Sequence, residues 1–129
     1  MGTNSFQHMN YCFKTFMEVT MYINVLQRIG DRATDMQQGD IIYKEIISGF
    51  EKQETVEIDF SGMKTVLSTF LNNAIGALYK DYSSDFLNQN LKISNLCDED
   101  MFILKRVISR AKDFYAQPQR VSDVLDENL

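Results

Sequence analysis

The residues best suited to chemistry gather in two segments of the chain, residues 30–39 and residues 59–69. Both segments carry hydroxyl, carboxylate and basic side chains. If each segment follows a parallel strand, both leave the same edge of a sheet, where open α/β sheets usually bind their ligands. An arginine and a helix N-terminus at that edge would stabilise a phosphate or carboxylate. We therefore predict a binding edge that contains Arg32, Thr34, Asp59, Ser61 and Lys64, with Ser68 and Thr69 as candidate phosphate acceptors or contact residues.

Catalysis would require partners that these residues lack. The single histidine, His8, is isolated from the candidates, so we predict no Ser-His-Asp set. The sequence has no phosphate-binding loop that ends in Gly-Lys-Ser/Thr, no HExxH and no paired CxxC. The two cysteines, Cys12 and Cys97, are interpreted as structural thiols. We therefore predict no enzyme activity, no metal and no cofactor.

A strand and a helix are predicted to position the second segment. Residues 55–60 alternate between apolar and polar side chains, which indicates a strand with one buried face; its apolar residues are Val56, Ile58 and Phe60. Ser61-Gly62 is a turn signal. Apolar residues then recur at steps of three and four and predict a helix over 69–82; its buried residues are Leu71, Ile75 and Leu78. A hydroxyl at Ser68 or Thr69 is expected to cap that helix.

The flanking sequence predicts further elements. Alternation indicates a strand over 18–26, a short strand over 9–13 that would pair with it as a hairpin, and a third over 91–95. The polar residues 30–39 and 83–90 are predicted to be loops. Asp40 is expected to cap a helix that runs to about Phe50. That helix is expected to bury Ile42, Ile46 and Phe50.

A last helix is predicted from the acidic residues 98–100 to a point before Pro118. Three adjacent carboxylates could suggest a metal site, but acidic residues are also favourable at a helix N-terminus because of its partial positive charge. We adopt the second interpretation. The predicted buried stripe is Met101, Leu104, Ile108, Ala111 and Tyr115. The acidic tail, residues 119–129, is either frayed or a short helix that docks on the domain or on a partner.

Composition limits the class of protein. The chain has 129 residues, a formal net charge of −5 and 44% hydrophobic residues, which suits a single domain with a core over about 18–116 and extensions at 1–10 and 117–129. The negative charge argues against nucleic acid and anionic membranes as partners. Because no apolar run is long enough for a membrane span and no signal pattern starts the chain, we expect a cytoplasmic protein.

The segment DFSGMKTVLSTFL resembles the core motif of STAS domains, the fold of anti-sigma-factor antagonists and of a domain in sulfate transporters. Asp59, Ser61 and Gly62 match the first half of that motif, and Ser68, Thr69 and Leu71 match the second. Leu67 and Phe70 depart from it, where the family has Asp and Gly. These departures are similar to the divergent STAS-like family of unknown function, whose Ser-x-Phe-Leu and Gly-x-Leu are matched at residues 68–71 and 76–78. The resemblance covers roughly residues 19–115.

This resemblance implies a fold and a function. The implied fold is α/β, with a small mixed or mostly parallel sheet of four to five strands and helices mainly on one face. The implied function is that of a bacterial regulatory interaction module, whose partner in the anti-sigma branch is a histidine-kinase-like ATPase that phosphorylates the serine aligned with Ser68. Two alternatives stay open: a sensor of a small anion or nucleotide, or an enzyme, that uses the edge around Arg32 and Ser68, and a purely structural subunit. The oligomeric state is left open.

Overall fold

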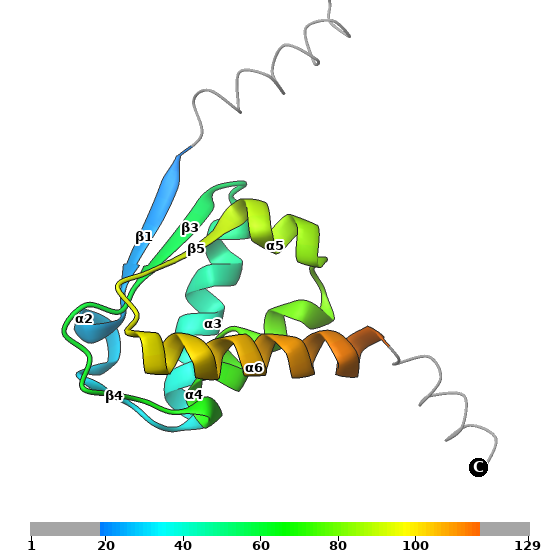
Figure 1. Cartoon of the computed structure of the whole chain (residues 1–129). Helices are drawn as coiled ribbons and strands as arrows, with labels where there is room; N and C mark the ends of the chain where they lie inside the picture. Colours follow the sequence, from blue (N-terminus) through cyan, green and yellow to red (C-terminus); the bar gives the residue numbers. More distant parts are fainter. Residues whose placement is uncertain (1–18, 117–129) are drawn as a thin grey trace, which may run out of the picture.

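The structure is a computed structural model that describes residues 19–116 of the chain (Figure 1). Three strands, β1 (Thr20–Asn24), β3 (Thr55–Asp59) and β5 (Leu91–Ser94), form a parallel sheet in the order β1-β3-β5. Two short strands, β2 (Arg32–Ala33) and β4 (Thr65–Val66), pair with each other in parallel. The predicted α/β fold with mostly parallel strands is confirmed, with its strands divided between a sheet of three and a sheet of two.

Helices connect these strands, since a parallel pair needs a long crossover. The helices are α2 (Val25–Ile29), α3 (Met36–Glu51), α4 (Ser68–Ala74), α5 (Ser84–Asn90) and α6 (Asp98–Ala116), and a 3-10 helix, η1 (Gly76–Lys80), follows α4. The segment from α2 to α3 joins β1 to β3, and the segment from β4 to α5 joins β3 to β5. Among the residues described, none of the helices has the length and apolar character that a membrane span requires.

The two faces of the three-stranded sheet differ in character. Ile23 and Ile58 pair across β1 and β3 and are completely buried. Tyr22, Glu57 and Lys92 form a row across the three strands on the opposite face, and none of them is buried. Figure 1 shows α3, α4 and α6 on the same side of the sheet, as expected for helices gathered mainly on one face. The other face is polar and open in the part of the chain described.

The core depends on a close contact between α3 and α4. A Cβ atom on Gly39 would lie only 2.7 Å from Asn73 Cβ and 2.8 Å from the Phe70 backbone oxygen, so this position has no room for a side chain. The Asn73 amide ties the two helices together by donating to the Met36 backbone oxygen at 3.1 Å and to Asp40 Oδ1 at 2.8 Å. The predicted burial of α3 is confirmed at Ile42, Ile46 and Phe50.

The predictions for residues 18–40 need two corrections. The first strand ends at Asn24, because the Asn24 side chain accepts a hydrogen bond from the Gln27 N–H at 2.9 Å and starts α2. The predicted loop over 30–39 contains β2 and the first turn of α3. Asp35, not Asp40, caps α3, in a capping box in which Asp35 accepts from the Gln38 N–H at 2.8 Å. The spacing Asp35-x-x-Gln38 was the sequence signal for this start.

The central helix is interrupted. The strand predicted over 55–60 is confirmed as β3, and the predicted burial of Leu71, Ile75 and Leu78 is also confirmed. However, α4 ends at Ala74, and the tighter η1 replaces the rest of the predicted helix over 69–82. The predicted loop over 83–90 is wrong, since α5 occupies it. Its cap is Ser83, whose Oγ accepts from the Phe86 N–H at 3.1 Å.

The C-terminal predictions agree with the structure as far as residue 116, except at Cys97. This thiol was expected to pack as a small hydrophobe, but it lies exposed in the segment between β5 and α6. The strand over 91–95 is confirmed as β5, and the acidic residues 98–100 lie in the first turn of α6. Leu104 and Ala111 of the predicted stripe are buried, and Val107 joins them. The hairpin strand over 9–13, the extension 1–10 and the tail 117–129 lie outside the described residues.

Candidate functional site

The predicted binding edge rests on two loops that leave the three-stranded sheet together. Asn24 and Asp59, the last residues of β1 and β3, pair in the parallel register, so the segments that follow them start at the same end. These segments meet again where β2 pairs with β4 and Arg32 lies opposite Thr65. The Leu67 N–H then donates to the Ala33 backbone oxygen at 2.9 Å. Arg32 and the start of α4 therefore lie at one end of the sheet, as predicted.

The basic side chains of this edge are held by neighbouring polar groups. Arg32 Nη1 lies 3.5 Å from Thr65 Oγ1, which is a long hydrogen bond, and the Arg32 side chain is exposed. Lys64 Nζ lies 3.7 Å from Asp31 Oδ2, also near the surface. The Thr34 N–H donates to Gln38 Oε1 at 2.8 Å, within the contacts that start α3. Both cations are therefore accessible, although each already has a local contact.

Asp59 has a different environment from these residues. Its Oδ1 accepts from the Ser61 N–H at 2.9 Å and from the Asn95 side-chain amide at 2.8 Å, and its Oδ2 accepts from the Tyr22 hydroxyl. Since Tyr22 belongs to β1 and Asn95 follows β5, the carboxylate at the end of β3 links all three strands. Asp59 is the one polar residue among the buried residues described.

These hydrogen bonds determine the ionisation of Asp59. The bond from Tyr22, followed by those from Asn95 and Ser61, holds the pKa of the Asp59 carboxyl well below its usual range, and outweighs burial, which acts in the opposite direction. The same contact raises the pKa of the Tyr22 hydroxyl, because the neighbouring carboxylate favours the protonated phenol. A carboxylate stabilised to this degree is a weak proton acceptor. Asp59 is therefore suited to organising the loops and poorly suited to general base catalysis.

Ser61 and Gly62 form the turn after β3, as the sequence predicted. The Ser61 backbone is fixed by Asp59, while the residue itself is exposed. Gly62 has a φ of 79°, a conformation that glycine adopts readily and residues with a Cβ do not. The first half of the motif is thus a local structure in which Asp59 caps its own turn.

Ser68 and Thr69 lie at the start of α4 as predicted, but neither is its cap. Leu67 occupies the N-cap position, and no side chain caps the helix there. Ser68 and Thr69 are the first two helical residues and are both exposed. Because α4 has only seven residues, its dipole gives weak support to an anion site at this end. The two hydroxyls are instead available to groups outside the domain.

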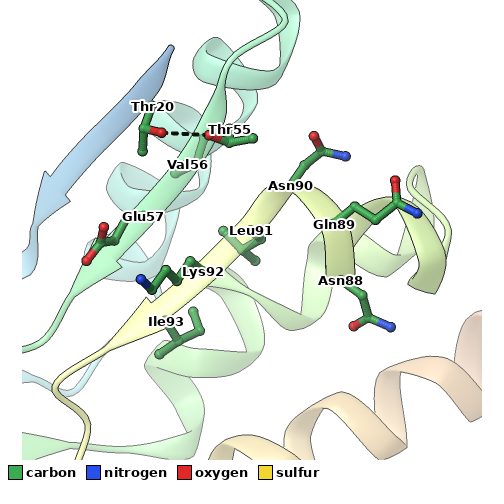
Figure 2. Close-up of a pocket in the computed structure, with 10 residues that line it drawn as sticks. All are labelled: Thr20, Thr55, Val56, Glu57, Asn88, Gln89, Asn90, Leu91, Lys92 and Ile93. Atoms are coloured by element: carbon green, nitrogen blue, oxygen red, sulfur yellow. Dashed lines mark hydrogen bonds between the residues drawn. The ribbon is translucent and has the colours of Figure 1, made fainter. Parts of the chain in front are cut away.

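A separate groove lies on the open face of the sheet, at the end opposite the predicted edge (Figure 2). It has a volume of about 570 Å³ and is lined by the starts of the strands and the end of α5, including Thr20, Thr55, Glu57, Asn90 and Lys92. The Thr20 and Thr55 hydroxyls, which belong to its lining, lie 2.9 Å apart on the neighbouring strands β1 and β3 (Figure 2). Its lining is polar and includes both an acid and a base, so the groove is unlike a deep apolar ligand pocket.

The contacts of Asp59 include two residues that the sequence prediction missed. Tyr22 could have been found, because it alternates with Met21 and Ile23 and must therefore share the polar face with Asp59. Asn95 gave no comparable signal: it has a φ of 59°, and its approach to Asp59 depends on the pairing of β3 with β5. Within residues 19–116, no three His, Cys, Asp or Glu side chains are grouped as a metal site.

Comparison with known families adds one finding to this geometry. Residues 38–101 match the model of a family described as a STAS-like domain of unknown function. This chain carries a STAS-like domain. The match includes the Asp59 turn, β4 and the start of α4, whereas Arg32 and Thr34 of the STAS-like domain lie before the matched residues. No curated protein and no solved structure gave a match.

Proposed function

We propose that this STAS-like domain is a non-enzymatic regulatory module of the cytoplasm that binds another protein through the start of α4. The observation that carries the proposal is the exposed sequence Leu67-Ser68-Thr69. Leu67 is 45% exposed and stands at an N-cap position, where Ser, Thr, Asp or Asn would stabilise the helix better. An apolar side chain that gives the domain neither burial nor a cap is well placed to be buried by a partner.

Phosphorylation of Ser68 or Thr69 is the switch that we propose for this contact. A phosphate would add a charge of about −1.5 to −2 beside Leu67, and would therefore oppose the burial of this surface against an apolar or acidic partner. Because neither hydroxyl caps α4, its modification would leave the fold intact. By its resemblance to the anti-sigma branch, the proposed partner and kinase is a histidine-kinase-like ATPase.

Two observations favour this function over a ligand sensor or an enzyme at the same edge. Arg32 and Lys64 already contact Thr65 and Asp31, so binding an anion would require each to leave a neighbour. Asp59, the buried carboxylate of the edge, is fully engaged by donors from three segments. Turnover of ATP or of simple esters by the purified protein, lost in Ser68→Ala, would support an enzyme instead.

The test is site-specific photocrosslinking in the native host. A photoreactive benzoylphenylalanine replaces Leu67 in one strain and Ile41 in the control strain, because Ile41 of α3 is also exposed, at 46%. We expect a discrete crosslinked protein from position 67 only. Intact-mass measurement of the captured domain then reports whether Ser68 or Thr69 carries a phosphoryl group. Crosslinks of equal yield from both positions, or none from position 67, would contradict the proposed contact.

Leu67→Asp separates stability from binding. Aspartate is a good N-cap, so the free energy of unfolding of this variant should exceed that of wild type by about 1 kcal/mol. The variant should nevertheless bind the crosslinked partner more weakly. Ser68→Asp and Thr69→Asp should fold like wild type and change affinity if charge is the signal. If the Leu67→Asp variant is more stable than wild type and binds the partner as tightly, the partner does not contact the start of α4.

A further inference from the structure

Helix α6 has an outer side that the described part of the chain leaves uncovered. Its inner side buries Leu104, Val107 and Ala111 against the rest of the domain. Its outer side carries Phe102, Arg106, Arg110 and Phe114, four exposed residues spaced by four along the helix, so that each lies beside the next. Phe102 is 63% exposed and Phe114 is 68% exposed. These four residues, which we call the α6 stripe, place an aromatic ring at each end of a basic centre.

The charges of the α6 stripe have no acidic partner within residues 19–116. The ion pairs in this part of the chain are Arg28–Glu45 and Lys64–Asp31, and neither involves α6. The Arg106 guanidinium lies over the Phe102 ring at 5.9 Å, a cation–π contact that keeps the charge at the surface. Lys105 and Lys112 are also exposed on α6 and add to the basic character. The carboxylates of α6 lie outside this centre, three in the first turn of the helix and one at Asp113.

A groove runs beside the second half of the α6 stripe. It has a volume of about 410 Å³ and lies between α6 and the α4–η1 segment. Arg110 and Phe114 line one wall. The opposite wall combines the small residues Gly76 and Ala77 of η1 with two polar residues of α4, Asn72 and Asn73. The groove can therefore accept an apolar side chain that arrives next to a carboxylate bound by Arg110.

We propose that the α6 stripe and its groove dock an acidic, amphipathic segment of a partner protein. Carboxylates of that segment would contact Arg106 and Arg110 in charge-assisted hydrogen bonds. Its apolar residues would cover the two phenylalanine rings, which lie about 18 Å apart along the helix, and one would enter the groove. This surface is separate from Leu67, so the proposal does not depend on the proposed function.

Charge decides between this occupant and two others. A second copy of the chain would bring its own Arg106 and Arg110 against this stripe in an antiparallel contact of two α6 helices, and like charges would repel. A nucleic acid would meet the four cations of α6, but also a net negative molecule and the carboxylates of Glu99 and Asp113 near the two ends. An acidic segment with apolar anchors matches both the cations and the rings.

The experiment selects random peptides from a display library on the full chain. Counter-selection uses the full chain with Arg106→Glu and Arg110→Glu, so that only peptides that need the stripe remain. We expect enriched peptides that combine Asp or Glu with large apolar residues. Synthetic, fluorescently labelled copies are then titrated by anisotropy. Binding should weaken as salt is raised, because the Debye length falls from about 10 Å at 0.1 M to about 3 Å at 1 M.

Matched variants locate the contact. Arg106→Glu with Arg110→Glu should weaken peptide binding about tenfold or more, whereas Lys44→Glu with Lys52→Glu, the same charge change at two exposed residues outside α6, should leave it within about twofold. Phe102→Ser and Phe114→Ser remove only exposed rings, so they should weaken binding without unfolding the domain. Circular dichroism confirms the fold of each variant.

Several results would overturn the proposal. These are no enrichment over empty beads, enriched peptides that are neutral or basic, or equal weakening by the Lys44 and Lys52 control. Tighter binding of a single-stranded oligonucleotide than of any peptide, lost in the arginine variant, would assign the stripe to nucleic acid. Self-association lost in Phe102→Ser would assign it to a second copy. Peptide binding only after removal of residues 117–129 would assign it to the chain's own tail.

Discussion

Asp59 and Ser68 belong to the same motif but have different environments. Asp59 is buried and accepts hydrogen bonds from three segments, so its carboxylate joins the three strands. Ser68 is exposed, and the N-cap residue next to it provides no side-chain cap. The motif therefore combines a structural carboxylate with an accessible hydroxyl. Substitution of Asp59 should lower the stability of the domain, whereas substitution of Ser68 should leave stability almost unchanged.

Replacement of Asp59 by Asn should destabilise the domain. The new side chain would keep one acceptor oxygen but turn an NH₂ group toward donors, and the loss of charge-assisted bonds should lower the free energy of unfolding by about 1–3 kcal/mol at pH 7. Because the folded-state pKa of Asp59 is lowered, its stabilisation is complete above the unfolded pKa of about 3.9 and is lost as pH falls toward the folded value.

Urea unfolding at pH 7 and pH 3 measures this effect. The difference between wild type and Asp59→Asn should be smaller at pH 3, where protonation of the unfolded wild-type chain removes part of the advantage. Tyr22→Phe is the companion variant: it removes the phenolic donor alone and should weaken the same pH dependence. A difference that is equal at both pH values would contradict an ionised Asp59 as the source of stability.

Ser68→Ala and Thr69→Ala should leave the free energy of unfolding within about 0.5 kcal/mol of wild type. Both residues are exposed and neither caps α4, and such surface positions tolerate substitution. Ser83→Ala is the matched control, because Ser83 Oγ does cap α5. That variant should lose about 0.5–2 kcal/mol. Thermal or urea unfolding of the three variants checks this prediction. A loss at Ser68 as large as that at Ser83 would mean that Ser68 acts as a cap after all.

At the scale of elements, the contact between α3 and α4 determines how the start of α4 is presented. The two helices approach each other at Gly39, and the Asn73 side chain bonds to residues of α3. β4, which immediately precedes α4, pairs in parallel with β2, and this pairing fixes the direction in which the chain enters α4. Leu67 and the two hydroxyls are exposed as a result of these contacts rather than by local helix preference.

Gly39→Ala should therefore destabilise the domain, although alanine is the better helix former. The added Cβ would meet Asn73 Cβ at 2.7 Å and the Phe70 backbone oxygen at 2.8 Å, so α3 and α4 must separate. Overpacking of this kind reduces the free energy of unfolding by about 1–3 kcal/mol. Ser48→Ala in the same helix is the control and should be near neutral. Equal stability of Gly39→Ala and wild type in urea unfolding would show that the contact can relax.

At the scale of the whole molecule, β3 is the central strand of the three-stranded sheet. β3 pairs with β1 on one side and with β5 on the other, and Val56 and Ile58 are buried beneath the helices. β1 and β5 are the outer strands of this sheet and each has one neighbour within it. The segments that contain Arg32 and Ser68 follow the end of this sheet, so function can vary there without disturbing the core.

Amide hydrogen exchange should reproduce this order. Protection factors should be highest for β3 and lower for β1 and β5, because the outer strands can separate locally without global unfolding. Exchange monitored by NMR at neutral pH gives the comparison residue by residue. In Asp59→Asn, protection should fall most around the Asp59 side chain, whose hydrogen bonds with Tyr22 and Asn95 are weakened. Uniform protection across the three strands would instead indicate that the sheet opens only as a unit.

The sequence by itself determined the elements whose side chains follow a regular period. The alternation at Val56, Ile58 and Phe60 and the apolar spacing of α3 and α6 were sufficient, since burial on one face imposes that period. The motif around Asp59 and Ser68 also identified the STAS-like domain, which the family match supports over residues 38–101. Short polar elements could not be predicted from this period. Helix α5 buries only Leu87 and therefore has almost no apolar pattern.

Only the tertiary structure decided the roles of individual side chains. Leu67 became the N-cap because its N–H is held by Ala33, a contact across two paired strands that residue type does not encode. Asp59 became a structural carboxylate because β1 and β5 bring Tyr22 and Asn95 to it from distant parts of the chain. The α6 stripe follows a four-residue spacing, but its exposure depends on which side of the helix packs against the rest of the domain. Local periods identify faces, and long-range packing determines which faces and polar groups remain available for binding.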